Sequence, residues 1–411
     1  MQTHLAPEFQ HSREGHAAEA ILRKCVHCGF CTATCPTYQL LGDELDGPRG
    51  RIYLIKQMLE GEEVTRSTQQ HLDRCLTCRN CESTCPSGVD YGQLVEIGRQ
   101  LVDERVRRPV AEQAQRWLLR EGLTSPLFAP AVKVGQALRP LLPAALGNKL
   151  PLGSATASGT WPVREHGRKV LMLAGCVQPT LAPNINAATA RVLDAAGIQV
   201  LLEPRAGCCG AVRSHLGDPQ GGLDDMRRNV DAWWPLVERN EVEAIVMNAS
   251  ACGLAVKEYG HALAHDPEYA ERARRIGALA LDLSELLPDL VPALQARLAG
   301  TQLPRVAFHP PCTLQHGQKL RGGVEAKLRA LGFEVEVAGE ESHLCCGSAG
   351  TYSVLQPGLS YPLRDRKLGH LGKLGADVIA SANMGCIQHL QSGTGTPVRH
   401  WIELLDEALK D

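Results

Sequence analysis

The chain lacks the features that would assign it to several large classes of proteins. Its 411 residues carry a net charge of −2, from 43 basic and 45 acidic side chains, so the overall charge does not indicate nucleic acid binding. No run of about 18 apolar residues occurs, which argues against a membrane-spanning helix. Residues 1–16 lack the apolar core of a secretory signal. We therefore expect a cytoplasmic protein with two or three domains.

Nucleotide-binding and nucleophile motifs are absent as well. The sequence has no G-x-G-x-x-G after a strand, no P-loop and no G-x-S-x-G turn. Nothing in it therefore predicts a site for a flavin or a nicotinamide. A protein without a two-electron cofactor depends on partners for substrate chemistry.

Cysteine, in contrast, is abundant, with 16 residues. In a reducing compartment these are metal ligands or redox groups more often than disulfides. Residues 25–36 read CVHCGFCTATCP and residues 75–86 read CLTCRNCESTCP, both with the spacing C-x2-C-x2-C-x3-C-P. In bacterial two-cluster ferredoxins the fourth cysteine of this pattern ligates the other cluster. The pattern predicts one [4Fe-4S] cluster on Cys25, Cys28, Cys31 and Cys85, and a second on Cys75, Cys78, Cys81 and Cys35.

A pair of zinc ribbons is the main alternative for these motifs. Zinc normally takes its four ligands as two separated pairs, whereas each motif here is a complete quartet that ends in proline, Pro36 or Pro86. Apolar residues at helical spacing predict helices within residues 47–61 and 91–107. The motifs are thus expected in a helical domain. The arginine-rich stretch 99–120 is interpreted as a solvated helix face rather than a phosphate- or lipid-binding patch.

Residues 121–166 are rich in proline, which predicts repeated helix breaks and a linker between domains. Two apolar pieces, residues 126–134 and 138–146, are expected to pack on a neighbouring domain. Contact with a membrane or with a partner protein is the alternative.

A second repeat contains the other eight cysteines, which form two sets: Cys176, Cys208, Cys209, Cys252 and Cys312, Cys345, Cys346, Cys386. In each set a strand-like run precedes the first cysteine, and a helix and a second strand precede a CCG triplet. This alternation predicts α/β modules with a mostly parallel sheet. The glycine of each triplet allows a turn that other residues resist.

Each of these sets supplies four thiolates, enough for one further iron–sulfur centre. A zinc site, a metal-free dithiol relay and simple packing of small residues are the alternatives. The histidines His309, His316 and His343 are interpreted as structural, with His309 and His343 the two that most need testing.

Together these motifs resemble the iron–sulfur subunits of glycolate oxidase, also called glycolate dehydrogenase. The cysteine-rich modules are shared with one of the subunits of heterodisulfide reductase, with one of those of anaerobic glycerol-3-phosphate dehydrogenase, and with lactate-utilisation proteins. The stretch HPPCTLQHGQKL, residues 309–320, and the overall length favour the glycolate family. Heterodisulfide reductase has a further cysteine three positions before the last one of each module, where this chain has Ala249 and Asn383.

The resemblance implies an α+β multidomain protein. A helical two-cluster ferredoxin-type domain (residues 1–120) and a proline-rich linker (121–166) precede two repeated α/β CCG modules (167–300 and 301–411, below module 1 and module 2). It implies an electron-transfer subunit that receives electrons from FAD-binding partners during oxidation of glycolate, and of D-lactate, and passes them toward quinone at the cytoplasmic face of the inner membrane. FAD is expected only on the partners. A catalytic protein like heterodisulfide reductase, an iron–sulfur subunit of a lactate or glycerol-3-phosphate dehydrogenase and a zinc-stabilised scaffold are the alternatives.

Overall fold

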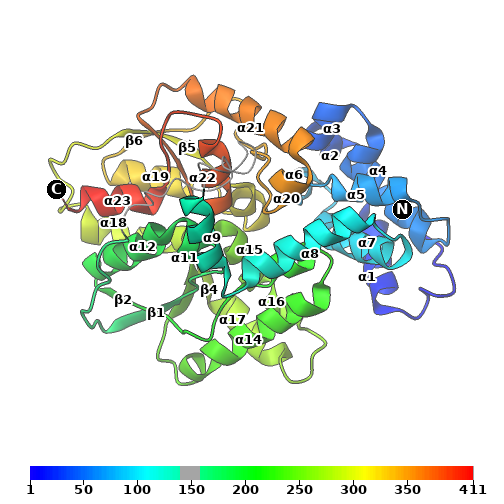
Figure 1. Cartoon of the computed structure of the whole chain (residues 1–411), viewed down its shortest axis with the longest axis horizontal. Helices are drawn as coiled ribbons and strands as arrows, with labels where there is room; N and C mark the ends of the chain where they lie inside the picture. Colours follow the sequence, from blue (N-terminus) through cyan, green and yellow to red (C-terminus); the bar gives the residue numbers. More distant parts are fainter. Residues whose placement is uncertain (139–157, 411) are drawn as a thin grey trace.

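The computed structural model describes residues 1–138 and 158–410, and its N-terminal part is helical (Figure 1). The helices are α1 (Arg13–Lys24), α2 (Phe30–Ala33), α3 (Pro36–Leu41), η1 (Glu44–Asp46), α4 (Pro48–Leu59), α5 (Arg66–Asp73), α6 (Asn80–Thr84) and α7 (Tyr91–Arg105). Helices α4 and α7 confirm the two predicted helices, and their buried residues Ile55 and Leu94 belong to one apolar core. Each cysteine motif begins directly after a helix, α1 or α5, so this core holds both motifs in place.

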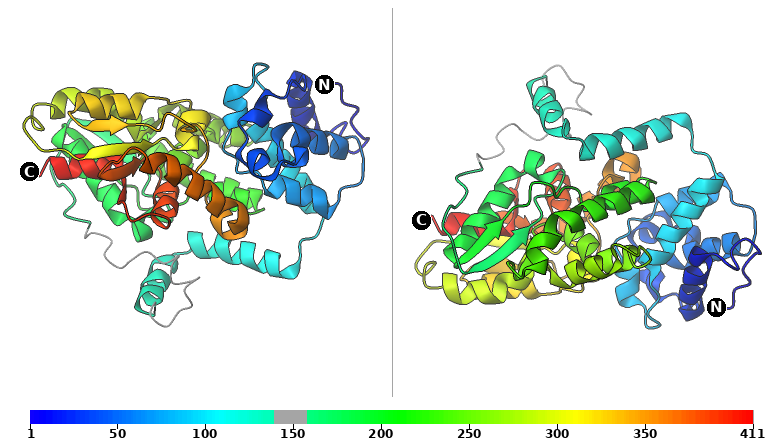
Figure 2. Two further views of the ribbon diagram at one scale, coloured as in Figure 1. Left: turned by 90° about the horizontal axis from the view of Figure 1, so that it is seen from above. Right: turned by 90° about the horizontal axis from the view of Figure 1, so that it is seen from below.

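Two further helices, α8 (Val110–Thr124) and α9 (Phe128–Ala137), lie along one side of the molecule (Figure 2). Helix α9 corrects the expectation of repeated helix breaks after residue 121. Pro130 lies in its first turn, where the missing N–H costs no hydrogen bond. The expected break does occur between the two helices, at residues 125–127. Most of the second apolar piece, residues 138–146, lies outside the described residues.

Helix α8 is held by ion pairs rather than by an apolar face. Arg108 and Arg116 both pair with Asp73 of α5, and Glu121 near the other end pairs with Arg213 of module 1. The interpretation of a solvated arginine face is therefore wrong for Arg108 and Arg116. Among the described residues, no helix combines the length and the apolar character needed to cross a membrane.

Each module contains a parallel sheet, as the sequence predicts, and each sheet has four strands. Module 1 has β1 (Arg168–Met172), β2 (Ile198–Leu201), β3 (Ala244–Met247) and β4 (Ala280–Asp282) in the order β2-β1-β3-β4. Module 2 repeats this order with β5 (Arg305–His309), β6 (Glu334–Glu336), β7 (Val378–Ser381) and β8 (Val398–His400). Val170 pairs with Val200 and Ala244, and its counterpart Val306 pairs with Val335 and Val378. The two sheets therefore have equivalent centres.

Helices cover the sheets and connect the parallel strands. In module 1 they are α11 (Gln178–Leu181), α12 (Pro183–Ala195), α13 (Ala211–His215), α14 (Pro219–Glu238), α15 (Ser250–Lys257), α16 (Tyr259–Ala262), α17 (Ala270–Leu279), η3 (Leu283–Leu286) and α18 (Leu287–Leu294). In module 2 they are η4 (Thr313–Gly317), α19 (Gly323–Ala330), α20 (Tyr352–Leu355), α21 (Pro357–Gly372), α22 (Met384–Gln391) and α23 (Trp401–Ala408).

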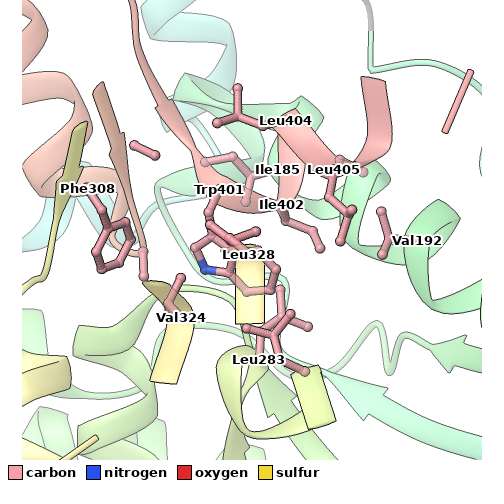
Figure 3. Packing of buried hydrophobic residues seen from close by; sticks show 14 of the residues in the cluster. Ile185, Val192, Leu283, Phe308, Val324, Leu328, Trp401, Ile402, Leu404 and Leu405 are labelled. Atoms are coloured by element: carbon pink, nitrogen blue, oxygen red, sulfur yellow. The ribbon is translucent and has the colours of Figure 1, made fainter. Parts of the chain in front are cut away.

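One hydrophobic core spans both modules, and a second core lies within module 1. Helix α23 of module 2 packs on α12 of module 1, and α18 of module 1 packs on α19 of module 2. Figure 3 shows the result around the buried Trp401, with Ile185 and Leu283 from module 1 beside Leu328 from module 2. The last helix of each module thus packs on a helix of the other module, and these contacts fix the modules relative to each other.

Candidate iron–sulfur sites

The structure brings together the four cysteines predicted to hold the first cluster, below the first quartet. Cys25, Cys28, Cys31 and Cys85 line one pocket. The pKa of the Cys31 thiol is raised to about 11, first by burial and then by the neighbouring thiols of Cys25, Cys28 and Cys85. Cys28 is exposed, and beside it Val26 and Phe30 retain 68% and 61% of their accessible surface. The first quartet thus reaches the protein surface at Cys28, where apolar side chains are also exposed.

The second quartet, Cys35, Cys75, Cys78 and Cys81, also forms one group. Burial raises the pKa of the Cys81 thiol well above its usual value, and the thiols of Cys78, Cys75 and Cys35 raise it further. Both predicted quartets therefore consist of thiols close enough to interact. Thiolates gathered in fours fit the ligand requirement of a cubane cluster, because each of its four irons needs one sulfur from the protein.

Two arginines lie close to Cys75 of the second quartet. Although burial opposes it, Arg51 and Arg99 keep the pKa of the Cys75 thiol below its usual value. The Arg51 side chain is 1% exposed, and its Nε donates to the carbonyl of His71 at 2.7 Å. Arg99 donates to the carbonyl of Cys75 at 2.6 Å. These arginines favour the thiolate form of Cys75.

The second quartet packs directly against module 2. Cys78 lies in the same apolar cluster as Cys312 and Cys345, together with Leu76 and Tyr352. Hydrogen bonds surround this cluster: Ser83 Oγ lies 2.8 Å from His316 Nδ1, and Asn80 Nδ2 donates to the carbonyl of His343 at 3.4 Å. The sequence alone gives no sign of this contact, because the two segments are more than 200 residues apart.

In module 1 the four predicted cysteines form a row of hydrogen-bonded thiols. Hydrogen bonds from Cys176 and then Cys209 lower the pKa of Cys208, although burial opposes this shift. Cys209 in turn shares hydrogen bonds with Cys208 and Cys252, which together with burial raise its pKa. Neighbouring sulfurs of this row interact, but no three of these four sulfurs lie within 4.8 Å of one another in the described structure. Metal binding would require their deprotonation.

Module 2 repeats this row. Cys312 Sγ lies 3.8 Å from Cys345 Sγ, and Cys346 shares hydrogen bonds with Cys345 and Cys386. Asn383 Nδ2 donates to Cys386 Sγ at 3.5 Å. The position where heterodisulfide reductase has a further cysteine therefore holds an amide that hydrogen-bonds to the last cysteine of the quartet.

The glycine of each CCG triplet adopts the backbone conformation that the sequence predicts. Gly210 has φ +92° and Gly347 has φ +88°. A Cβ at these positions would lie 2.7 Å from the carbonyl of Gly222 and 2.4 Å from that of Ser360. Only glycine fits this close approach, which presents the vicinal sulfurs to the site.

The three histidines differ in their contacts. His316 is hydrogen-bonded at both ring nitrogens, to Ser83 and to the carbonyl of His343, which agrees with a structural role. His343 is partly buried, and its carbonyl accepts bonds from both His316 and Asn80. His309 is 1% exposed, and neither ring nitrogen has a hydrogen-bond partner among the described residues.

Sequence reasoning missed the charged residues around the cysteines. Arg51, Arg99 and Lys367 stand in helices without a motif. Lys367 is 3% exposed, and its Nζ donates to the carbonyls of Glu341 and Ser342. Burial lowers the pKa of Lys367, while the thiols of Cys346 and Cys345 oppose this shift. A lysine and two arginines on otherwise apolar helix faces were the sequence signal from which buried charges near the cysteines could have been predicted.

Two family models match the regions that carry these quartets. A model described as a 4Fe-4S dicluster domain matches residues 21–89, and one described as a cysteine-rich domain matches residues 170–257 and 306–391. The fold and the sites thus define an iron–sulfur protein with a helical dicluster domain and two cysteine-rich domains. This confirms the predicted fold class.

Similarity to known proteins shows which family of iron–sulfur proteins the chain belongs to. The chain is 54% identical to the glycolate oxidase iron-sulfur subunit of Escherichia coli (strain K12) over the full length of both proteins. It is 29% identical to the probable glycolate oxidase iron-sulfur subunit of Bacillus subtilis (strain 168), over 94% of this chain and 92% of the relative. One of the subunits of the fumarate reductase (CoM/CoB) of Methanothermobacter marburgensis is 24% identical over 95% of this chain and 73% of the relative. The chain belongs to the family of glycolate oxidase iron–sulfur subunits.

Proposed function

We propose that this chain is the electron-transfer subunit of a complex that oxidises glycolate to glyoxylate, and D-lactate as a further substrate. Cys25, Cys28, Cys31 and Cys85 hold one [4Fe-4S] cluster, and Cys75, Cys78, Cys81 and Cys35 hold the other. The module quartets hold one or two further iron–sulfur centres. FAD is bound by partner subunits, which perform the chemistry on the hydroxy acid. The 54% identity to a glycolate oxidase subunit and the absence of a flavin motif in the sequence support this division.

One observation supports the electron-transfer role most strongly. Cys78 of the second quartet packs with Cys312 and Cys345 of module 2, while Cys28 of the first quartet is exposed. When bound, iron–sulfur clusters accept and release single electrons. The quartets therefore line a path from the surface at Cys28, through the second quartet, into the interior of module 2.

The partner that carries FAD docks at the first quartet. Val26 and Phe30 flank the exposed Cys28, and Tyr53 nearby retains 46% of its accessible surface. Apolar side chains around an exposed ligand favour close, dry contact with another protein. Phe30→Asp should weaken binding of the FAD-containing subunit without changing the iron content. Unchanged binding would contradict docking at this face.

The complex is peripheral on the cytoplasmic face of the inner membrane and delivers electrons to quinone. Exposed apolar side chains on α8, such as Trp117 (57%) and Leu118 (65%), support this proposal, as does Leu127 (72%) before α9. Trp117→Ser with Leu118→Ser should reduce co-sedimentation of the complex with vesicles of bacterial lipids. Loss of a partner protein instead would show that this face binds that partner.

Cys28→Ser tests the main proposal. This variant should lose one cluster and block glycolate-dependent dye reduction by the complex, while the flavin stays bound to the partners. Thr32→Ser, in the adjoining helix α2, is the matched control because it keeps the hydroxyl that bonds to the carbonyl of Gly29. Full activity of Cys28→Ser would contradict the relay.

A catalytic role in disulfide cleavage is the second candidate, and the vicinal cysteines with interacting sulfurs favour it. It predicts disulfide reduction by the isolated chain with a low-potential electron donor. The Asn383 amide at the position of the further cysteine of heterodisulfide reductase argues against it.

A further inference from the structure

The two modules differ at one position beside their quartets. His309 ends β5, three residues before Cys312, the first cysteine of module 2. The equivalent position of module 1, three residues before Cys176, is Leu173. Both side chains are buried, at 1% and 3% exposure. A fold that accepts leucine at this position does not require an imidazole for packing.

His309 also lies close to the sulfurs. One ring nitrogen of His309 and the sulfurs of Cys346 and Cys386 all lie within 4.8 Å of one another, and all three residues are buried. No hydrogen-bond partner for either ring nitrogen exists among the described residues. Burying an unsatisfied polar group is unfavourable, so native proteins rarely retain one without a further role.

Two other buried histidines of module 2 have hydrogen-bond partners away from the cysteines. His316 bonds at both nitrogens to residues of the domain contact, and His389 Nε2 lies 3.1 Å from Ser360 Oγ. His309 thus combines proximity to the cysteines with ring nitrogens that have no other partner in the described structure.

We propose that His309 supplies an imidazole ligand to the metal centre of module 2, whereas the centre of module 1 has thiolate ligands alone. This inference rests on the proposed function, which places an iron–sulfur centre in one or both modules, and it concerns module 2. Imidazole binds both iron and zinc. In iron–sulfur proteins, histidine in place of cysteine raises the reduction potential. If the centre is an iron–sulfur cluster, module 2 holds the more easily reduced centre of the two, next to the second quartet at Cys78.

The test uses the full chain, purified without oxygen and labelled with 15N-histidine. Four proteins are compared: wild type, His309→Leu, which copies module 1, His309→Cys, which keeps a ligand, and His400→Asn. His400 is the control because its buried ring accepts a bond from the amide of Ile402, and asparagine retains this capping ability. Iron, zinc and sulfide are quantified, and circular dichroism verifies folding.

If the metal is iron, pulsed electron paramagnetic resonance should detect histidine nitrogen in the wild type and in His400→Asn, and none in the two His309 variants. If it is zinc, X-ray absorption at the zinc edge should show one nitrogen neighbour that these two variants lose. His309→Cys should keep the metal content. A nitrogen signal that persists in His309→Leu, or a wild type with sulfur neighbours alone, would overturn the proposal.

Cys346→Ser separates this proposal from the one on which it rests. One outcome is that Cys346→Ser loses metal while His309→Leu keeps its metal and an unchanged spectrum. In that case the proposal of an imidazole ligand is wrong, whereas the proposal of a metal site in module 2 is supported. If Cys346→Ser retains the full metal content of the wild type, the metal site of module 2 is itself wrong.

Discussion

The hydroxyl of Tyr352 in module 2 donates a hydrogen bond of 2.9 Å to the backbone carbonyl of Arg74, the residue before Cys75. The Tyr352 ring is 6% exposed and packs with Leu76 and Cys345. One side chain thus joins the start of the second cysteine motif to the CCG turn of module 2.

Tyr352→Ala should slow electron transfer between the second quartet and module 2, because it opens a cavity at their contact. Removing a buried aromatic side chain costs about 3–5 kcal/mol, part of which loosens the domain contact. Rapid-freeze spectroscopy after addition of reductant would measure the rate. Tyr352→Phe, which loses only the hydroxyl, is the control and should show a smaller effect. Equal rates in Tyr352→Ala and wild type would contradict a path through this contact.

Arg99→Gln should lower the reduction potential of the cluster on the second quartet, because a positive charge near Cys75 stabilises the reduced, more negative cluster. A unit charge at this range changes the potential by on the order of 50 to 100 mV. Redox titration followed by electron paramagnetic resonance measures it. Arg105→Gln, on the same helix but paired with the exposed Glu8, should leave the potential unchanged. A similar shift in both variants would rule out a local effect of Arg99.

Asp73→Asn should lower the free energy of unfolding by about 1–3 kcal/mol at pH 7. Although burial opposes ionisation, Arg108 and Arg116 hold the pKa of this carboxyl below its usual value. A carboxyl with a lowered folded-state pKa stabilises the protein above its unfolded pKa, about 3.9, and this stabilisation is lost as the pH falls through the folded value.

Thermal unfolding of wild type and Asp73→Asn at pH 7 and below pH 4, under identical anaerobic conditions, tests the direction of this pH dependence. The difference between wild type and Asp73→Asn should shrink at the lower pH. Asp224→Asn is the control, since this carboxylate is 63% exposed and its pair with Arg227 contributes little. A difference that grows on acidification would contradict the ion-pair account.

Gly347→Ala should destabilise the CCG turn of module 2 by about 1–3 kcal/mol and reduce its metal content. The added Cβ would meet the carbonyl of Ser360 at 2.4 Å in a left-handed conformation. Gly339→Ala, with open space around it, is the control. Metal analysis and thermal unfolding give the two readouts, and normal values of both in Gly347→Ala would refute the role of this turn.

The sequence predicted the elements that depend on local pattern. Apolar spacing predicted α4 and α7, and the apolar runs before Cys176 and Cys312 predicted β1 and β5. Strands β4 and β8 were not predicted, because each runs directly into the helix that follows it. Their ends at Asp282 and His400 instead cap the helices that follow, each through a capping box.

Long-range relationships could not be predicted. The spacing of cysteines indicates which thiols can share a centre, but not which centres lie side by side. The contact of Cys78 with Cys345 and the packing of α23 on α12 depend on side chains far apart in the chain. His309 was interpreted as structural, and the sequence could not show that its buried ring nitrogens have no hydrogen-bond partner among the described residues.

The central claim is that the eight N-terminal cysteines hold two clusters through which electrons from glycolate pass. The most direct measurement is electron paramagnetic resonance of the complete complex, frozen without oxygen before and after addition of glycolate. The account predicts about eight iron and eight sulfide ions per chain from these quartets, and signals of two reduced, interacting [4Fe-4S] clusters that appear with glycolate. A folded complex that oxidises glycolate while this chain contains neither iron nor sulfide would contradict it.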